Sequence, residues 1–128
     1  MKSLLALAER PTGVFCANDL IAMGALKAAL TAGLAVPREL SIVGCDDVEM
    51  ASVMTPELTT IAVPARELGA RAARLLLRQL AGEEVAPKPG RLLPVRLVKR
   101  GTTAEPKGTG DREQGTAGTS AGASGSST

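Results

Sequence analysis

Apolar residues in the first hundred positions fall into two kinds of run. Short, nearly continuous apolar runs are typical of strands buried on both faces, whereas apolar positions spaced three and four apart predict helices. The strand-like runs are 13–17, 40–43, 58–63 and 92–98. The helix-like runs are 2–9, 20–32 and 64–81. This alternation predicts an α/β domain with a layered, largely parallel sheet and right-handed crossover connections.

Proline and composition mark the limits of this domain. Pro64 suits the first position of a helix that continues to about Ala81. Pro94 lacks a backbone N–H, which favours an edge strand or a bend for the last run. From Glu105 onward the chain is mainly Gly, Thr, Ser and Ala without apolar periodicity. We therefore expect one domain over residues 1–104 and a disordered, low-complexity tail over 105–128.

Polar side chains follow two of the predicted strands. The run 40–43 continues through Gly44 to Asp46 and Asp47, and Asn18 follows the run 13–17. Ligands of open α/β sheets lie outside the carboxyl ends of the strands, so these side chains are candidate ligand contacts. A second interpretation stays open, in which Asp47 forms a turn or a helix cap and Asn18 occupies a left-handed turn.

The helix expected over 20–32 is unusually apolar. Lys27 is the only charged residue in its body, so the helix is either enclosed within a larger body or contacts another subunit. Its high alanine content offers a simpler explanation. Asp19 is well suited to cap this helix. Met50 and Met54, in the segment after Asp47, fit either an adaptable contact surface or core packing.

The composition excludes several chemistries. Phe15 is the only aromatic residue, and the chain has no His, Tyr or Trp. A Ser-His-Asp or Cys-His nucleophile pair and the usual Cys/His zinc site are therefore excluded, as is an aromatic surface for stacking nucleic-acid bases. A net charge of +2 does not indicate phosphate binding by itself, and the basic cluster Arg91, Arg96, Lys99 and Arg100 is interpreted as a solvated strand edge. We expect no metal, no cofactor and no enzymatic activity.

The cysteines and the N-terminus indicate a cytoplasmic protein. Cys16 and Cys45 each lie near the end of an apolar run and are not in CxxC spacing, which favours reduced, buried thiols. If their strands are neighbours, the two thiols could lie close together. The apolar start of the chain ends at Glu9 and Arg10, too early for a signal peptide. No segment approaches the roughly 18 apolar residues of a membrane span, so no membrane contact is expected.

Five ordered motifs carry a family resemblance over about residues 4 to 104. They are RPTGVFCANDLIAMGAL at 10–26, GLAVP at 33–37, SIVGCDD at 41–47, TPELTTI at 55–61 and LLPVRLVKR at 92–100. Together they resemble the C-terminal part of the lactose/galactose-repressor (LacI/GalR) family. The resemblance implies a partial type I periplasmic-binding-protein fold, in which two α/β subdomains enclose a small sugar or nucleoside-like effector. It also implies a homodimer that binds operator DNA through an N-terminal helix-turn-helix.

The resemblance gives roles to particular residues. Asn18 and Asp46 match positions that hydrogen-bond the effector, whereas Asp47 is interpreted as shaping the turn into the dimer segment. The helix 20–32 and the segment after Asp47 match the dimer surface. Residues expected at that surface are Ile21, Met23, Leu26, Lys27, Met50 and Met54. Cys45 replaces the usual Tyr or Phe, and Val63 stands where the lactose repressor has a polar effector contact, so the resemblance does not name the effector.

The same resemblance predicts what this chain does not contain. We expect the helix-turn-helix, the hinge and most of the first subdomain to be absent, so that operator DNA is reached only through a domain outside this chain. In the family, the helix 64–81 packs on the first subdomain. Its apolar stripe, which includes Leu68, Leu75 and Leu76, is therefore expected to lack a partner. We expect the isolated chain to be marginally stable, oligomeric or aggregated.

Two other functions stay open. A fragment of a periplasmic sugar-binding protein of a transporter would share the fold. A phosphoacceptor enzyme would use Asp19, Asp46 and Asp47 to hold magnesium and Lys99 to steady the phosphoryl group, but the order of elements does not fit.

Overall fold

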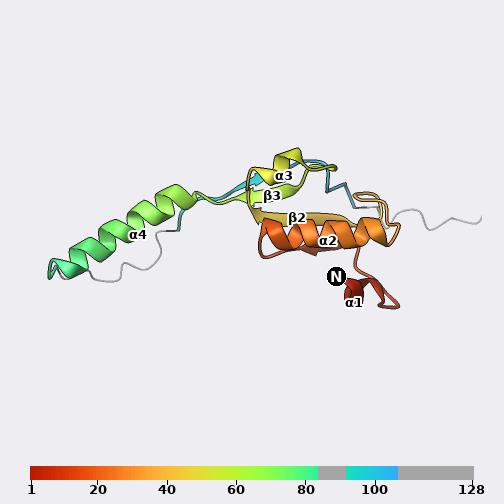
Figure 1. Cartoon of the computed structure of the whole chain (residues 1–128), viewed down its shortest axis with the longest axis horizontal. Coiled ribbons are helices and arrows are strands. Elements are labelled where there is room, and N and C mark those ends of the chain that lie inside the picture. Colours follow the sequence, from red (N-terminus) through yellow and green to blue (C-terminus); the bar gives the residue numbers. More distant parts are fainter. Residues whose placement is uncertain (84–91, 107–128) are drawn as a thin grey trace, which may run out of the picture.

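A computed structural model of the chain describes residues 1–83 and 92–106, and it confirms the α/β class. In chain order the elements are α1 (Lys2–Leu5), β1 (Gly13–Phe15), α2 (Asp19–Thr31), β2 (Ser41–Asp46), α3 (Met50–Val53), β3 (Thr59–Ala62), α4 (Ala65–Leu80) and β4 (Arg96–Val98). Figure 1 shows the strands with α2 and α3 in one body, from which α4 projects. The predicted tail, apart from residues 105 and 106, lies outside the described residues.

The four strands form one sheet in the order β1-β2-β3-β4. β1, β2 and β3 are parallel, with Phe15 opposite Val43 and Val43 opposite Thr59. β4 pairs antiparallel with β3 at the edge of the sheet. The largely parallel sheet is thus confirmed, and Pro94 lies before the edge strand that it was expected to mark.

Three predicted elements are shorter in the structure. The first helix ends at Leu5 rather than at Glu9, the first strand ends at Phe15, and the last strand is limited to Arg96–Val98. Each of these elements lies at an edge of the body and buries little apolar surface. Apolar sequence alone therefore predicted more regular structure there than packing supports.

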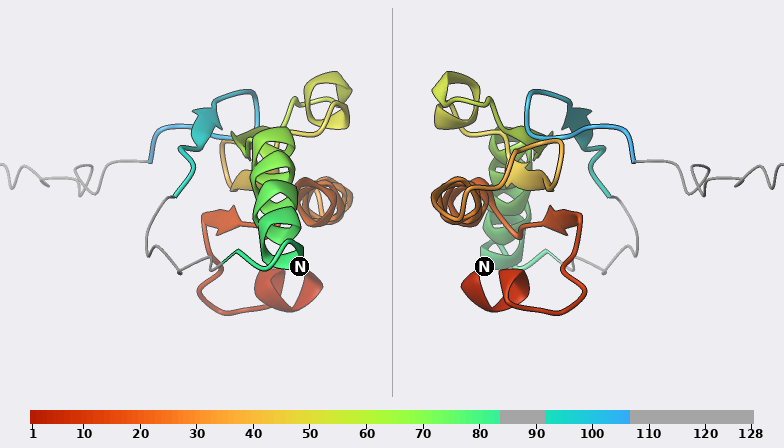
Figure 2. Two further views of the ribbon diagram at one scale, coloured as in Figure 1. Left: turned by 90° about the vertical axis from the view of Figure 1, so that its left-hand side faces the viewer. Right: turned by 90° about the vertical axis from the view of Figure 1, so that its right-hand side faces the viewer.

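The core lies between α2 and one face of the sheet. Buried side chains of α2, such as Leu26 and Ala22, pack with Ile42 of β2 and with Leu58, which precedes β3. Figure 2 shows α2 and α3 on the same side of the strands. The opposite face carries no helix of the described chain (Figure 2). Phe15, on the edge strand β1, is exposed.

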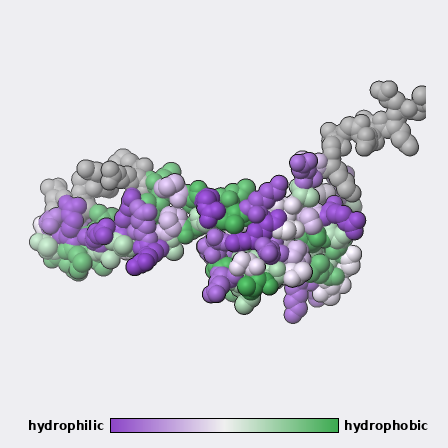
Figure 3. Space-filling model, turned by 90° about the horizontal axis from the view of Figure 1, so that it is seen from above, coloured by the Kyte–Doolittle hydropathy of each residue, from purple (hydrophilic) through white to green (hydrophobic). Residues whose placement is uncertain are grey.

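α4 has a clear apolar stripe that is not covered. No residue of α4 is buried, and its leucines, including Leu68, Leu75 and Leu76, are exposed. Figure 3 shows hydrophobic and hydrophilic surface side by side on the lobe that α4 forms. The stripe thus lacks a partner within the described residues, as expected from the sequence.

Gly44 of β2 lies where the core has no room for a side chain. A Cβ at this position would overlap the Oδ1 atom of Asp19 and would lie 3.1 Å from Leu58 Cδ2 and 3.3 Å from the Ala22 Cβ. β2 therefore approaches the start of α2 closely at this point, and only glycine allows that approach.

We predict that Gly44→Ala destabilises the protein by about 1–3 kcal/mol, because the added methyl group overpacks a region bounded by the buried Asp19 carboxylate and the side chains of Leu58 and Ala22. Gly24→Ala is the matched control: a Cβ at Gly24 meets nothing within 4 Å. In the body of α2, alanine is expected to stabilise by up to about 1 kcal/mol. Urea unfolding of both variants measures the difference, and equal stability of the two would contradict the packing described here.

Candidate functional site

The carboxyl ends of β1 and β2 meet at one edge of the sheet. The two strands are parallel, and the ladder continues past β1 with a hydrogen bond from Cys16 N to Val43 O of 2.8 Å. Asn18 follows β1, and Asp46 is the last residue of β2. The two predicted effector contacts therefore lie at the same edge, which we call the rim.

Asn18 caps α2. Its Oδ1 accepts a hydrogen bond of 2.8 Å from Ile21 N, and its backbone is extended with φ −152°. The prediction that Asp19 caps this helix is wrong, because α2 begins at Asp19 and the oxygen one residue earlier takes that role. The left-handed alternative for Asn18 is wrong as well. Its Nδ2 group donates to no atom within the described residues and remains available at the rim.

Asp46 presents an unpaired carboxylate at the rim. The residue is exposed, and its side chain makes no hydrogen bond or ion pair within residues 1–83 and 92–106. Its φ of 121° lies in a region that residues with a Cβ seldom adopt. A charged acceptor without a partner is therefore held in an uncommon backbone conformation, which is typical of functional positions.

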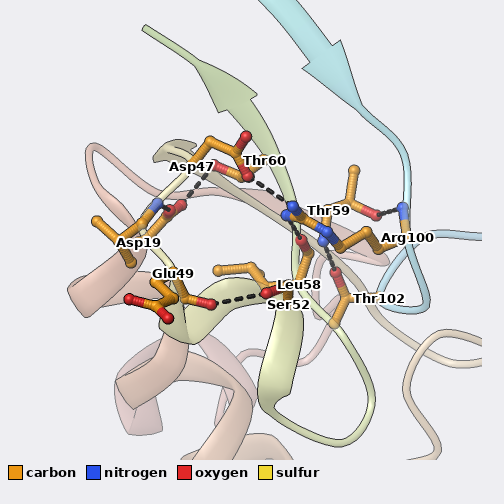
Figure 4. Close-up of polar contacts among 10 residues, drawn as sticks. Asp19, Asp47, Glu49, Ser52, Leu58, Thr59, Thr60, Arg100 and Thr102 are labelled. Atoms are coloured by element: carbon orange, nitrogen blue, oxygen red, sulfur yellow. Dashed lines mark hydrogen bonds and ion pairs between the residues drawn. The ribbon is translucent and has the colours of Figure 1, made fainter. Parts of the chain in front are cut away.

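Asp47 differs from Asp46 in having a partner. Its Oδ1 lies 2.7 Å from Nη2 of Arg100, and the two side chains are 22% and 15% exposed, respectively. Arg100 also donates from Nη1 to Leu58 O at 2.9 Å (Figure 4). Asp47 has a φ of 56°, as expected of a turn residue.

The interpretation of Arg100 as part of a solvated strand edge is wrong, because its side chain is paired with Asp47. Arg96 and Lys99 are exposed, and Arg91 lies outside the described residues.

Asp19 is the contact that sequence reasoning missed. Its side chain is 0% exposed. Oδ1 accepts from Thr60 Oγ1 at 2.5 Å, and Oδ2 accepts from Val48 N at 2.9 Å (Figure 4). Both donors are distant in the chain, so the only sequence signal was a glycine in β2 that leaves space for the carboxylate. The Asp19 carboxylate therefore joins α2, β3 and the turn after β2.

Hydrogen bonds of Thr59 and Thr102 hold the segment after β4 against the sheet. Thr102 Oγ1 donates to Ile42 O at 2.7 Å and accepts from Thr59 N at 2.9 Å, while Thr102 O accepts from Ile42 N at 2.8 Å. Both threonines are buried. This segment thus pairs with β2 at Ile42, one residue before the pairing of β2 with β3 begins. It also places Arg100 near Asp47. No apolar alternation in the sequence predicts that this segment pairs with β2.

The residues expected at a dimer surface divide into three groups. Ile21 and Met50 are 54% and 57% exposed, and Lys27 is exposed. Met23 and Met54 are partly buried against the core. Leu26 is 1% exposed, so its side chain belongs to the core rather than to a surface that a second subunit could contact. Two exposed apolar residues, Leu20 and Val53, were not named from the sequence.

The phosphoacceptor alternative does not fit this geometry. It requires several free carboxylates, but Asp19 is enclosed by Thr60 and Val48, and Asp47 is paired with Arg100. Within the described ranges, no group of three or more His, Cys, Asp or Glu residues could hold a metal ion.

The two cysteines lie on opposite faces of the sheet. Both are free thiols. Phe15 and Val43 are paired, so the next residue of the ladder, Cys16, faces the α2 side, while Cys45 shares the other face with Val43. Burial raises the pKa of Cys16. Burial, and then the charges of Asp46 and Asp19, raise the pKa of Cys45.

Residues 1–103 match a family described as the periplasmic binding protein-like domain. This match covers most of the chain, which therefore belongs to that family.

The matched relatives narrow the class further. The chain is 45% identical over 103 residues to the HTH-type transcriptional repressor CytR of Escherichia coli (strain K12), covering 80% of this chain and 30% of the repressor. A lac repressor dimer bound to operator and the anti-inducer ONPF matches with a TM-score of 0.65 and 44% identity, over 74% of this chain and 32% of that one. A LacI family regulator from Enterococcus faecium with bound ribose matches with a TM-score of 0.66 and 39% identity, over 83% and 38%.

These matches place the chain within the effector-binding domain of LacI/GalR-type transcriptional regulators, which are not enzymes. The chain spans about a third of the length of these relatives. The transporter alternative has no support among them, because each is a transcriptional regulator. No helix in the described part of the chain has the length and apolarity needed to span a bilayer.

The raised pKa of Cys45 gives a test of the rim's charge. A raised pKa leaves less thiolate at a given pH, so alkylation of Cys45 is expected to have its midpoint above that of an ordinary thiol. Asp46→Asn removes a neighbouring negative charge and is expected to move this midpoint to lower pH. Mass spectrometry of the alkylated peptides separates Cys45 from Cys16. Glu49→Gln, which also removes an exposed carboxylate, is the control, and a midpoint that Asp46→Asn leaves in place would contradict the geometry.

Proposed function

We propose that this chain is the C-terminal part of the ligand-sensing domain of a LacI/GalR-type transcriptional regulator. Its rim contributes Asp46 and Asn18 to the binding of a small sugar or nucleoside-like effector. Effector binding then controls DNA binding through a homodimer. The observation that carries the proposal is the unpaired Asp46 carboxylate at the sheet edge shared with the Asn18 amide.

The two side chains have complementary hydrogen-bonding capacity. An ionised Asp46 only accepts hydrogen bonds, whereas Asn18 has an amide group that donates, because its oxygen already caps α2. A sugar hydroxyl can donate to the carboxylate, and a hydroxyl or ring oxygen can accept from the amide. This pair therefore suits a ligand with adjacent hydroxyl groups, such as a pentose or the ribose of a nucleoside.

The matched relatives support this ligand class. The regulator from Enterococcus faecium holds ribose, and the lac repressor is bound to an operator as a dimer together with an anti-inducer. The described chain also fits the proposal that a LacI/GalR-type effector lies between two subdomains, since Asp46 at the rim is exposed and has no partner within the described residues.

The proposed dimer surface combines α2 and α3. Exposed apolar residues of α2, Leu20 and Ile21, and of α3, Met50 and Val53, supply side chains that a second subunit could bury. Lys27 adds a charged position on α2. Met23 and Met54 offer less exposed surface to a second subunit, because they are partly buried against the core.

Calorimetric titration of the intact protein that contains this chain tests the effector site. The panel is D-ribose, D-galactose, adenosine and cytidine. For any compound that binds, Asp46→Asn is expected to weaken the affinity about 10- to 100-fold, because a hydrogen bond to a charged group contributes about 1.5–3 kcal/mol. Asn18→Ser keeps an oxygen that can cap α2 but removes the amide donor, and is expected to weaken the affinity about 2- to 10-fold.

Glu49→Gln is the matched control for the charge change. Glu49 is exposed near the rim and its side-chain carboxylate holds no described partner, so its removal is expected to leave affinity unchanged. Wild-type affinity in Asp46→Asn, or no binding of any compound of the panel, would contradict the proposal.

A further inference from the structure

Asp19 is the only buried acidic residue in the part of the chain that the structure describes. Its carboxylate is enclosed, with both oxygens engaged, so it cannot contact a ligand at the rim. A buried carboxylate is costly unless its oxygens accept hydrogen bonds, and here a hydroxyl and a backbone N–H supply them. Such an arrangement indicates that Asp19 acts on its neighbours rather than on a ligand.

One of the two hydrogen bonds of Asp19 reaches the backbone of the turn that follows Asp46. Val48, whose N–H donates to Asp19 Oδ2, comes directly after the two residues with positive φ, Asp46 and Asp47. This turn is therefore held on two sides: Arg100 binds the side chain of Asp47, and Asp19 binds the N–H of Val48. Thr60 fixes the carboxylate from β3 (Figure 4).

Asp19 is also the residue that follows Asn18. Asn18 Oδ1 caps α2, and Asp19, the first residue of α2, accepts a hydrogen bond from the turn after β2. The Asp19 carboxylate thus connects the residue after Asn18 to the turn that follows Asp46. Gly44 completes the arrangement, because any side chain there would displace Asp19 Oδ1.

We infer that Asp19 is the positioning residue of the rim, which sets Asp46 relative to Asn18 by holding the turn at Val48. The inference rests on the proposed function for the claim that Asp46 and Asn18 contact the effector. It adds that effector affinity depends on a residue that the effector never touches.

The first part of the test uses no ligand. Amide hydrogen exchange is measured on the intact protein that contains this chain, in Asp19→Ala, Asp19→Asn, Thr60→Val and Thr60→Ser. Exchange of the Val48 amide is expected to rise at least about tenfold relative to Ile42 in Asp19→Ala and Thr60→Val. It is expected to stay within about threefold of wild type in Asp19→Asn and Thr60→Ser, which keep an acceptor for Val48 and a hydroxyl for Asp19, respectively.

This pattern separates positioning from a general structural role. If the Val48 and Ile42 amides exchange faster by the same factor in Asp19→Ala and Thr60→Val, the variants only destabilise the fold and the inference is overturned. Thr60→Val is close to threonine in shape, so it supplies the answer if Asp19→Ala does not fold.

The second part uses D-ribose and adenosine as probes, titrated into folded protein. Affinity is expected to fall about tenfold in Thr60→Val and to be retained in Thr60→Ser. In the Asp46→Asn background, Thr60→Val is expected to have no further effect, because the carboxylate that it positions is gone.

The outcomes keep the two claims apart. Loss of affinity in Asp46→Asn with unchanged affinity in Thr60→Val would overturn the inference and leave the proposed function in place. Unchanged affinity in Asp46→Asn, or no binding of either probe, would overturn the proposed effector contact, and amide exchange then decides the role of Asp19 by itself.

Discussion

The enclosure of one carboxylate between a helix, a strand and a turn is the constraint on which this structure depends. Asp19 needs donors for both oxygens, and it takes them from Thr60 of β3 and from Val48 after β2. Satisfying it brings α2 against the sheet, and this close approach is possible only because Gly44 has no side chain. The same contact fixes the turn that carries Asp46 to the rim, so packing of the core and presentation of the candidate ligand contact share a cause.

The two neighbouring acids show how strongly local surroundings divide similar residues. Asp47 forms an ion pair with Arg100, which also donates a hydrogen bond to the Leu58 carbonyl. The Asp47 carboxylate therefore holds the segment after β4 in place. Asp46, one residue earlier, points to solvent without a partner in the described chain. Both residues have a positive φ, 121° at Asp46 and 56° at Asp47. The rim therefore offers one free acid and one amide, which is a small number of polar groups for a site that, in a LacI/GalR-type regulator, is expected to lie between two subdomains.

Much of the fold could be predicted from the sequence, because its signals are local. The apolar runs and their glycines and prolines predicted the parallel strands and the long helices, and placing Asn18 and Asp46 after two strands predicted that they share an edge. What could not be predicted depends on contacts between distant residues. The residues next to Asp19 in the chain do not show that Thr60 will be its partner, and those next to Arg100 do not show that Asp47 will be. The helical spacing of Leu26 does not show which face of α2 packs on the sheet.

The central claim is that Asp46 and Asn18 together contact the effector while Asp19 stays buried behind them. A crystal structure of the intact protein that contains this chain, in complex with D-ribose, tests it most directly. The account predicts ligand oxygens within about 3.2 Å of both the Asp46 carboxylate and the Asn18 amide nitrogen. It also predicts that Asp19 still accepts from Thr60 and Val48. Ribose bound elsewhere, or a complex in which Asp46 binds a group of the protein instead, would contradict it.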